Sequence, residues 1–539
     1  MCMRMVWRRG LSCFSGIAQR PRACGGICLA IVAGAFPVGA NPAGAAERQQ
    51  AAAVERFNMD AELQLAEGRR LFERVWQAKD ERSRSGDGLG PVFNDRSCKA
   101  CHHQGGTGGG GGNANNVQVI TTSGSGVAST SNAKERRRVT QTHPGLVENT
   151  SVVLHRFGTT HGYEMWRAKR LRDAVVVDHA VPGADREFQA SAAQLRAIDA
   201  IASSGPLNSL LLPGELPQSI GPQKNSESRS GWGGGSFGGP QARSSKRKPD
   251  KPTTRVEQRN STALFGAGAI DAIPEGILEE TAAWQKAHQP AQAGRAVRTA
   301  DGKIGRFGWK SQQSNLNDFT LTACAVEVGL DVPGHSQGIG PDRMNYKAPG
   351  LDLDIVDCGA LVAFIRALPA PVQQKSRAAS DAVEQGHALF LRVGCADCHL
   401  ENLGEAKGIY SDLLVHDMGE KLWGDSYGAF VAQPPKAAPA GPAAKADAVH
   451  IGEWRTPPLW GCADSAPYLH DGRAETLEEA IRAHGGQGAR SAADFAAMPP
   501  VAQEKVIAFL KSLTVPPNQR IAKPRPAAGL AQKSKRKAP

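Results

Sequence analysis

Apolar residues recur at helical spacing in two distant stretches of the chain, residues 361–368 and 506–513. In each stretch they fall at i, i+3, i+4 and i+7, which gathers them into one stripe along a helix. A proline follows each stretch, at Pro369 and Pro516, where a helix cannot continue. The pattern therefore predicts two helices that each bury one face.

Each predicted helix closes a longer internal repeat. The segment Glu67–Phe72 precedes Cys98–His102, and the similar segment Gln385–Phe390 precedes Cys395–His399. The same order therefore occurs twice: an opening helix, a CxxCH motif and a closing helix. Self-similarity of this kind indicates two copies of one structural unit.

The repeat divides the chain of 539 residues into four parts. We predict a signal peptide at 1–45, a first domain at 46–370, a second domain at 371–515 and a basic disordered tail at 516–539. The first domain is larger because it contains a glycine-rich stretch, 105–112, and a stretch rich in Ser, Gly and Lys, 222–258. Such stretches bury too little apolar surface to offset the entropy of ordering them, so we expect loops or flexible insertions. A shorter Ala/Pro run, 432–446, interrupts the second domain.

The net charge of +12 is confined to the appendages of the predicted domains. The leader carries +5, the stretch 222–258 carries +5 and residues 515–539 carry +7, which leaves −5 on the rest. Basic residues on flexible segments are typical of solvated tails, so the charge argues against a nucleic-acid partner.

The N-terminus has the pattern of a secretory leader. Five arginines and no acid accompany an apolar stretch, Ile27–Phe36, and small residues follow up to Ala45. The apolar stretch is shorter than the roughly 20 residues that a membrane helix needs. We expect cleavage after Ala45 and a periplasmic or otherwise exported chain without a membrane span; a leader retained as an anchor is the alternative.

The cysteines fall mainly in the leader and in the two CxxCH motifs. Of eleven, four lie in the leader, four in the motifs, and Cys324, Cys358 and Cys462 remain. Three cysteines cannot all pair within one chain, so this is no disulfide scaffold. In CxxCH, the two thiols add across the haem vinyl groups and the histidine binds the iron. The duplicated motif therefore predicts two covalent c-type haems, on Cys98, Cys101 and His102 and on Cys395, Cys398 and His399.

The ligand on the far side of the second iron has two candidates. Thr476–Glu479 has the form of a capping box that starts a helix, and His484 followed by two glycines ends it. We favour His484. The alternative is Met498, because a methionine before a proline and a closing helix is a familiar axial arrangement in small cytochromes.

Further segments carry a resemblance to a known family. They are Gly88–Asp95, Arg306–Lys310, Arg455–Trp460 and Ala466–Arg473. Over about residues 60–515 the chain resembles the di-haem cytochrome c peroxidase superfamily, and within it the branch of di-haem oxidoreductases. The resemblance implies a mostly α fold in which two cytochrome c-like haem domains pack together, with long irregular loops in the first. Asn260–Pro274 also matches this branch, and we expect a structural role there.

The resemblance also implies different roles for the two haems: the first reacts with peroxide and the second delivers electrons. Trp309 takes the position of a tryptophan between the haems, and Glu327 that of a glutamate over the first iron, where it would act as acid and base on peroxide. A glutamine common in true peroxidases is absent from Phe319–Thr322. Other candidate ligands of the first iron are Met344, His103, His155 and His161.

The function implied is that of a periplasmic di-haem oxidoreductase of peroxidase type. Hydrogen peroxide would be the oxidant, and a small cytochrome or a cupredoxin the electron donor. Calcium, which related proteins hold between their domains, is a further candidate cofactor, although no acidic cluster has the spacing of a calcium loop. The alternatives are an oxygenase or protein-modifying enzyme of the same superfamily, and a non-enzymatic electron carrier.

The duplicated motif generates the first testable prediction. Intact-mass measurement of the exported protein should show two haem additions, because each CxxCH motif forms two thioether bonds. The double variant Cys395→Ala/Cys398→Ala should keep one haem. A wild-type protein with one haem or none would contradict the interpretation.

Overall fold

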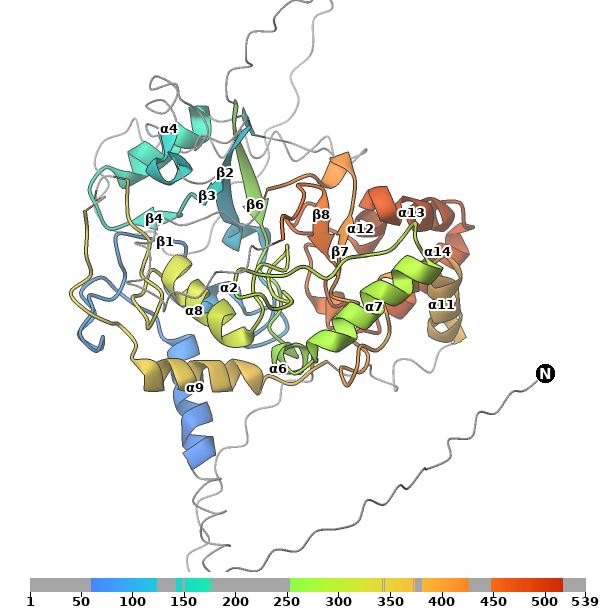
Figure 1. The fold of residues 1–539 in the computed structure, drawn as a ribbon, viewed down its shortest axis with the longest axis horizontal. Helices are drawn as coiled ribbons and strands as arrows, with labels where there is room; N and C mark the ends of the chain where they lie inside the picture. The colour runs from blue at the N-terminus through green and yellow to red at the C-terminus, as the bar shows by residue number, and fades with distance from the viewer. Residues whose placement is uncertain are drawn as a thin grey trace, which may run out of the picture. The chain divides into compact units, whose positions relative to one another are not determined.

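The computed structural model describes residues 60–123, 142–147, 151–173, 175–176, 253–341, 343, 345–371, 373, 381–425 and 447–516 (Figure 1). The predicted signal peptide, Met344, the Ala/Pro run 432–446 and nearly all of the basic tail lie outside these residues. None of the helices in the described part of the chain combines the length and apolar character needed to cross a membrane.

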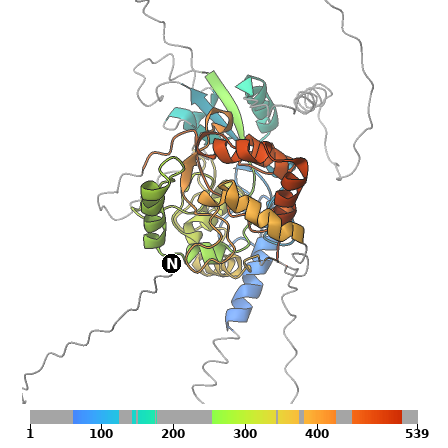
Figure 2. The ribbon, with the colours of Figure 1, turned by 90° about the vertical axis from the view of Figure 1, so that its right-hand side faces the viewer.

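The helices of the repeat are present at both predicted places. The opening helices are residues 60–73 and α11 (Asp381–Arg392), and the closing helices are α9 (Ile355–Arg366) and α14 (Pro500–Leu510). The remaining α-helices are α2 (Cys98–Cys101), α4 (Tyr163–Asp173), α6 (Ala267–Asp271), α7 (Glu275–His288), α8 (Leu316–Val326), α12 (Leu477–Ala483) and α13 (Ala489–Ala496). Figure 2 shows the C-terminal helices, in orange and red, from the end at which they gather.

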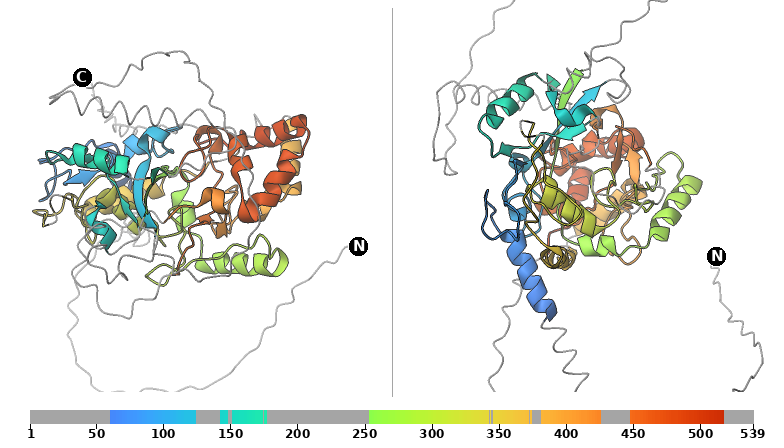
Figure 3. Two further views of the ribbon diagram at one scale, coloured as in Figure 1. Left: turned by 90° about the horizontal axis from the view of Figure 1, so that it is seen from above. Right: turned by 60° about the vertical axis from the view of Figure 1, so that its left-hand side comes forward.

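A four-stranded sheet accompanies the helices, and the expectation of a mostly α fold did not include it. Its order is β3 (Ser151–Val153), β2 (Val117–Ser123), β6 (Thr253–Arg259) and β5 (Val175–Val176). Two short pairs add β1 (Val92–Phe93) with β4 (Phe157–Gly158) and β7 (Val415–Asp417) with β8 (Glu453–Arg455). Helix α4 lies beside the larger sheet (Figure 3), where its Leu171 packs on Ile120 and Val256.

Strand β6 corrects the prediction for the insertion 222–258. Residues 253–258 are not a flexible loop, because they pair along their whole length with β2 in antiparallel register. The physical reason is local: Val256 is buried between polar neighbours, so a short alternating strand lies hidden at the end of a polar stretch. Residues 222–252 lie outside the described part of the chain.

The opening and closing helices of each repeat cross at a glycine. A Cβ atom at Gly68 would overlap the carbonyl oxygen of Ala360 and lie 2.7 Å from Phe364 Cβ. A Cβ atom at Gly386 would likewise overlap the carbonyl oxygen of Lys505 and lie 3.0 Å from Phe509 Cβ. Both crossings therefore require a residue without a side chain, since backbone touches backbone.

The same aromatic cluster surrounds each crossing. Phe72 lies 5.4 Å from Phe364 and 6.4 Å from His102, measured between ring centroids. In the second repeat, Phe390 lies 5.2 Å from Phe509 and 6.4 Å from His399. In both repeats the CxxCH histidine thus lies at the same distance from the phenylalanine ring beside the crossing, which extends the sequence repeat to three dimensions.

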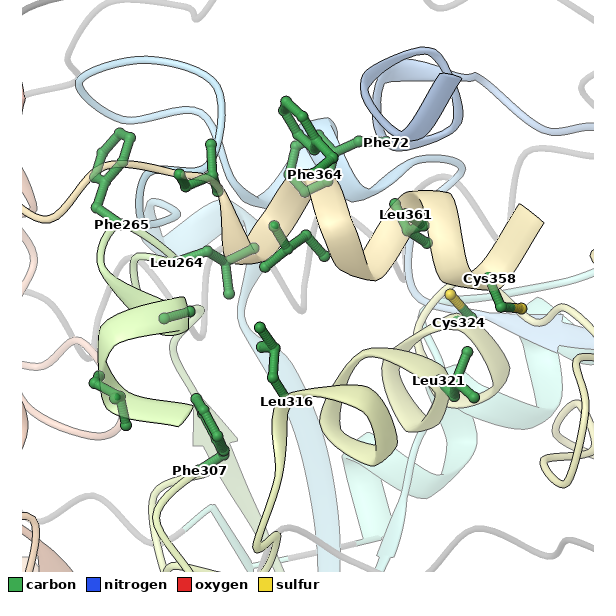
Figure 4. Packing of buried hydrophobic residues seen from close by; sticks show 14 of the residues in the cluster. Phe72, Leu264, Phe265, Phe307, Leu316, Leu321, Cys324, Cys358, Leu361 and Phe364 are labelled. Carbon is green, nitrogen blue, oxygen red and sulfur yellow. The ribbon is translucent and has the colours of Figure 1, made fainter. Parts of the chain in front are cut away.

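Apolar side chains of α8, α9 and the segment 264–273 form the core beside the first motif (Figure 4). Leu316 and Leu321 of α8 and Leu361 and Phe364 of α9 are buried in it. Cys324 and Cys358 lie near each other where these two helices pack, and both are free thiols. A second cluster, around Phe390 and Phe509, lies beside the second motif.

The glycine crossings generate a prediction for stability. Gly68→Ala and Gly386→Ala should each lower the free energy of unfolding by about 1–3 kcal/mol, because the added methyl must push two helix backbones apart. Gly359→Ala is the matched control, since this helical glycine has nothing within 4 Å of the added Cβ atom. Alanine there should be neutral or stabilising by up to about 1 kcal/mol. Denaturant unfolding of the haem-loaded protein measures the difference, and equal effects at Gly68 and Gly359 would contradict the role of the crossing.

Candidate haem sites

The second CxxCH motif forms a tight turn that fixes its histidine. Gly394 adopts a left-handed conformation, φ 80°, and a short 3-10 helix, Cys395–Asp397, follows it. The ring Nδ1 of His399 lies 2.9 Å from the carbonyl oxygen of Tyr410. A carbonyl can only accept, so Nδ1 carries the proton and Nε2 is left as the basic nitrogen, which is the form that binds a metal.

His399 and His484 line one cavity of about 280 Å³, together with Cys395 and Cys398. The predicted capping box is present: Thr476 Oγ1 accepts from the Glu479 backbone N–H, and helix α12 ends at His484. His484 Nδ1 lies 2.7 Å from the carbonyl oxygen of Ala480, so this ring is also locked with Nε2 as its basic nitrogen. Met498 packs against the second hydrophobic cluster and is not among the residues that line this cavity.

These residues fit a covalently attached haem. The sulfurs of Cys395 and Cys398 are thiols in this structure and stand for the thioethers that attachment would form. Burial lowers the pKa of His399 to about 4 and also lowers the pKa of His484, so both imidazoles are neutral near pH 7. Two thiols and two neutral imidazoles on the wall of one largely apolar cavity are a donor set that suits an iron porphyrin.

The first CxxCH motif is built in the same way around helix α2, whose N-cap Ser97 accepts from the Ala100 backbone N–H. His102 Nδ1 lies 3.2 Å from the carbonyl oxygen of Gly109, and burial lowers the pKa of His102 to about 4. The glycine-rich stretch 105–112 therefore has a defined, largely buried backbone here. A Cβ atom at Gly109 would overlap the Gln104 carbonyl oxygen, so glycine lets this loop fold back under His102.

Glu327 ends helix α8 close to the first motif, near enough to Cys101 for its charge to raise the pKa of that thiol. Its Oε2 accepts a hydrogen bond from Asn94 Nδ2 at 2.7 Å, and its carbonyl oxygen accepts from the Asn94 backbone N–H at 2.7 Å. The surrounding protein raises the pKa of the Glu327 carboxyl to about 7, against the lowering effect of the Asn94 hydrogen bond. A carboxyl with this pKa can both take up and release a proton near neutral pH.

Trp309 lies elsewhere, on the wall of the cavity that holds His399 and His484. Its Nε1 donates to the carbonyl oxygen of Asn260 at 2.9 Å, and its ring meets His470 edge-on with centroids 6.4 Å apart. Arg455 joins this wall, because its backbone N–H donates to the carbonyl oxygen of Trp309 at 2.9 Å. The structure thus brings Trp309 and Arg455–Trp460 together but does not place Trp309 and Glu327 in one site.

Asn260 connects the two haem sites. Its side chain donates to the carbonyl oxygen of Gly111 in the loop under His102, at 2.8 Å. Its backbone N–H donates to the carbonyl oxygen of His470 at 2.8 Å, and its own carbonyl oxygen accepts from Trp309. The structural role expected for Asn260–Pro274 is therefore visible in detail at its first residue.

Sequence reasoning missed a buried polar pair beside the second motif, Asp412 and His416. His416 Nε2 lies 2.9 Å from Asp412 Oδ2, and its Nδ1 lies 3.5 Å from Cys398 Sγ. Burial alone would lower the pKa of His416, but the charge and hydrogen bond of Asp412 raise it to about 10. The available signal was an aspartate and a histidine inside the apolar run 409–416, where polar residues need a partner.

The other candidate ligands of the first iron have separate surroundings. His155 is buried with Nε2 3.0 Å from the carbonyl oxygen of Val326, the residue before Glu327. His103 and His161 are exposed. Among the described residues, the one group arranged to hold a metal ion is Cys398, Asp412 and His416, which offers a single carboxylate and so does not resemble a calcium site.

Comparison with known proteins agrees with the haem assignment in the C-terminal part. Residues 354–513 match the model of the family described as "Di-haem oxidoreductase, putative peroxidase". No curated protein matches the chain.

The chain is also similar to two solved structures. Hydrazine synthase of Kuenenia stuttgartiensis is 18% identical with a TM-score of 0.28, over 48% of this chain and 73% of that chain. A MauG-like protein associated with microbial copper homeostasis is 19% identical with a TM-score of 0.24, over 46% of this chain and 90% of that chain. Similarity at these TM-scores is too weak to support a conclusion about fold or function. The family match covers the stretch that holds the second CxxCH motif, His399, His484 and the closing helix α14, and over this stretch the chain is similar to the di-haem oxidoreductases.

Proposed function

We propose that this chain is an exported c-type cytochrome with two covalent haems that acts as a peroxidase-type oxidoreductase. Electrons would enter at the second haem and reduce hydrogen peroxide at the first. The haem irons, when bound, supply the one-electron chemistry. The protein's own residues then decide which iron is open to substrate and where protons move.

One observation carries this proposal: the same arrangement of glycine crossing, phenylalanine pair and locked histidine occurs at both motifs. Each CxxCH histidine has its Nδ1 on a backbone carbonyl, at 3.2 Å for His102 and 2.9 Å for His399. Such a hydrogen bond sets the ring's orientation and makes Nε2 a better ligand. An arrangement repeated with this precision is expected where two irons are to be held alike on one side.

The far sides of the two sites differ, and this difference supports separate roles. The second site offers His484, a partly buried imidazole on the same cavity as His399, so the second iron would be six-coordinate and suited to electron transfer. The first site offers Glu327, a carboxyl whose pKa of about 7 suits acid–base work. Asn94 holds that carboxyl in place through a 2.7 Å hydrogen bond.

Glu327 has a defined task in this proposal. Reduction of peroxide to water requires that a proton move from one peroxide oxygen to the other as the bond between them breaks. A carboxylate held beside the site can accept the first proton and return it to the departing oxygen. Trp309, on the wall of the second cavity, would lie on the electron path between the two haems.

Location, partners and further cofactors follow from the sequence and remain parts of the proposal. The leader indicates export to the periplasm, where a small cytochrome or a cupredoxin would donate electrons. Calcium between the repeats is a further proposed cofactor. The rival functions are an oxygenase or protein-modifying enzyme of the same superfamily and a plain electron carrier, and the spin state of the first iron separates the carrier from the enzymes.

The second iron gives a prediction that distinguishes its two candidate ligands. His484→Ala should convert that iron from low-spin to high-spin, because its sixth ligand is lost, while Met498→Leu should leave the spectrum unchanged. Absorption and electron paramagnetic resonance spectra of the oxidised protein measure this. A methionine–iron charge-transfer band that disappears in Met498→Leu would show that Met498 is the ligand.

Glu327 gives a prediction for activity and its pH dependence. With a pKa of about 7, the carboxyl is protonated at low pH and cannot accept a proton, so the rate with peroxide should rise as pH increases through 7 and then level off. Glu327→Gln should keep both haems, lose about 10²–10⁴-fold in rate and lose this pH-dependent rise. Stopped-flow mixing of the half-reduced protein with peroxide measures both effects.

Trp309→Phe is the matched comparison for Glu327→Gln. It should slow electron transfer between the haems while the first reaction with peroxide keeps its rate. Equal peroxide rates in wild type and Glu327→Gln would remove Glu327 from the mechanism, and an unreactive wild type would favour the oxygenase or carrier function.

A further inference from the structure

Asp412 and His416 form a buried polar pair beside the second haem attachment site, and several hydrogen bonds hold the pair in place. Asp412 is fully buried and His416 is 2% exposed. Asp412 Oδ2 accepts from His416 Nε2 at 2.9 Å and from Gln285 Nε2 at 2.8 Å, and its Oδ1 accepts from the Leu414 backbone N–H at 3.0 Å. Three hydrogen bonds from three different donors hold this carboxylate in one position.

Helix α7 supplies the third member of this group. Gln285, also fully buried, donates to the carbonyl oxygen of Asp397 at 2.8 Å as well as to Asp412, and its Oε1 accepts from the Gly294 backbone N–H at 2.9 Å. Gly294 in turn leaves room for the His416 ring, because a Cβ atom there would lie 2.5 Å from Nε2. The His416 ring is therefore held in one orientation from both sides.

That orientation points Nδ1 of His416 at Cys398 Sγ, 3.5 Å away. The sulfur can donate a proton only while it is a thiol. Once it is a thioether of the attached haem, it can only accept. Both neighbours of the ring are then acceptors: the Asp412 carboxylate lies at Nε2 and the sulfur lies at Nδ1. Each ring nitrogen must therefore carry a proton, because a nitrogen without one would place its lone pair against an acceptor.

We propose that His416, oriented by Asp412, donates a hydrogen bond from Nδ1 to the thioether sulfur of Cys398 and thereby raises the reduction potential of the second haem. His416 is a positioning and tuning residue, since it touches the attachment bond and not the iron. The inference rests on the proposed covalent haem at Cys398.

The direction of the effect follows from electrostatics. Reduction adds an electron to the haem, and a positive N–H group at its edge stabilises that added charge. The Asp412 carboxylate opposes this, and one of its oxygens lies within 4.8 Å of the Cys398 sulfur, but the His416 ring is nearer, at 3.5 Å, and the interaction falls with distance. The charge nearest to the haem is therefore the positive imidazole of His416. This favours the reduced state, from which the second haem is proposed to deliver electrons.

The experiment is a redox titration of the haem-loaded protein, followed by absorption spectroscopy at each haem. His416→Leu should lower the potential of the second haem by about a tenfold change in its reduction equilibrium, which is about 59 mV for one electron. His416→Gln restores a neutral donor and should give a smaller shift in the same direction. The potential of the first haem should not move in either variant.

Asp417→Asn is the matched control. It removes a negative charge one residue away, but this carboxylate is exposed and bonds to the Gly419 backbone N–H, so solvent screens it and the second haem should keep its potential. If His416→Leu fails to fold, His416→Gln alone carries the test.

Two outcomes overturn the inference and are distinguishable. An unchanged potential in His416→Leu and His416→Gln, with haem attached at Cys398, would overturn this inference and leave the proposed function standing. A wild-type protein without haem at Cys398 would overturn both.

Discussion

The close approach of two helix backbones at a glycine is the constraint on which each haem site depends. Gly68 and Gly386 let the opening helix touch the closing helix directly, and the phenylalanine four residues later reaches the CxxCH histidine. The spacing between glycine and phenylalanine is the same in both repeats, and the phenylalanine and histidine rings are 6.4 Å apart in both. A wider crossing would move the aromatic ring, and with it the wall of the haem pocket.

Backbone carbonyl groups then fix the orientation of the histidine rings, and two of these three carbonyls lie in irregular chain. The partner of His102 is Gly109 in a loop of glycines, the partner of His399 is Tyr410 after a series of turns, and the partner of His484 is Ala480 one helical turn earlier. Three different local structures thus give the same result, an imidazole whose Nδ1 is held by a backbone carbonyl.

The sequence was sufficient for features that local patterns determine. The helical stripes, the prolines after them and the capping box at Thr476 each depend on residues within a few positions of one another, and all are present. The sheet was not predicted, because β6 is paired with β2 across more than a hundred residues and its only strong apolar position is Val256. Strand pairing between distant segments produces little pattern in the few residues of sequence from which a strand is predicted.

The same distinction holds at the sites. The CxxCH residues were identified by spacing, whereas Asn94 beside Glu327 and Gln285 beside Asp412 come from distant segments and only the fold brings them near. The glycine-rich stretch 105–112 has the composition of a flexible loop, yet its backbone is buried by contacts with residues 104 and 261. The glycine-rich composition indicates how much conformational freedom this stretch has in the unfolded chain. In the folded protein these contacts remove that freedom.

Helix α7 contacts the second motif, and this contact limits how the chain can be divided. Gln285 belongs by sequence to the first repeat, but its side chain completes the hydrogen bonds of Asp412 and of the Asp397 carbonyl in the second. A fragment that starts after residue 371 would lack it and would leave a buried carboxylate short of a donor. The second repeat therefore cannot be excised as a self-contained module, because a residue of the first repeat supplies one of its buried hydrogen bonds.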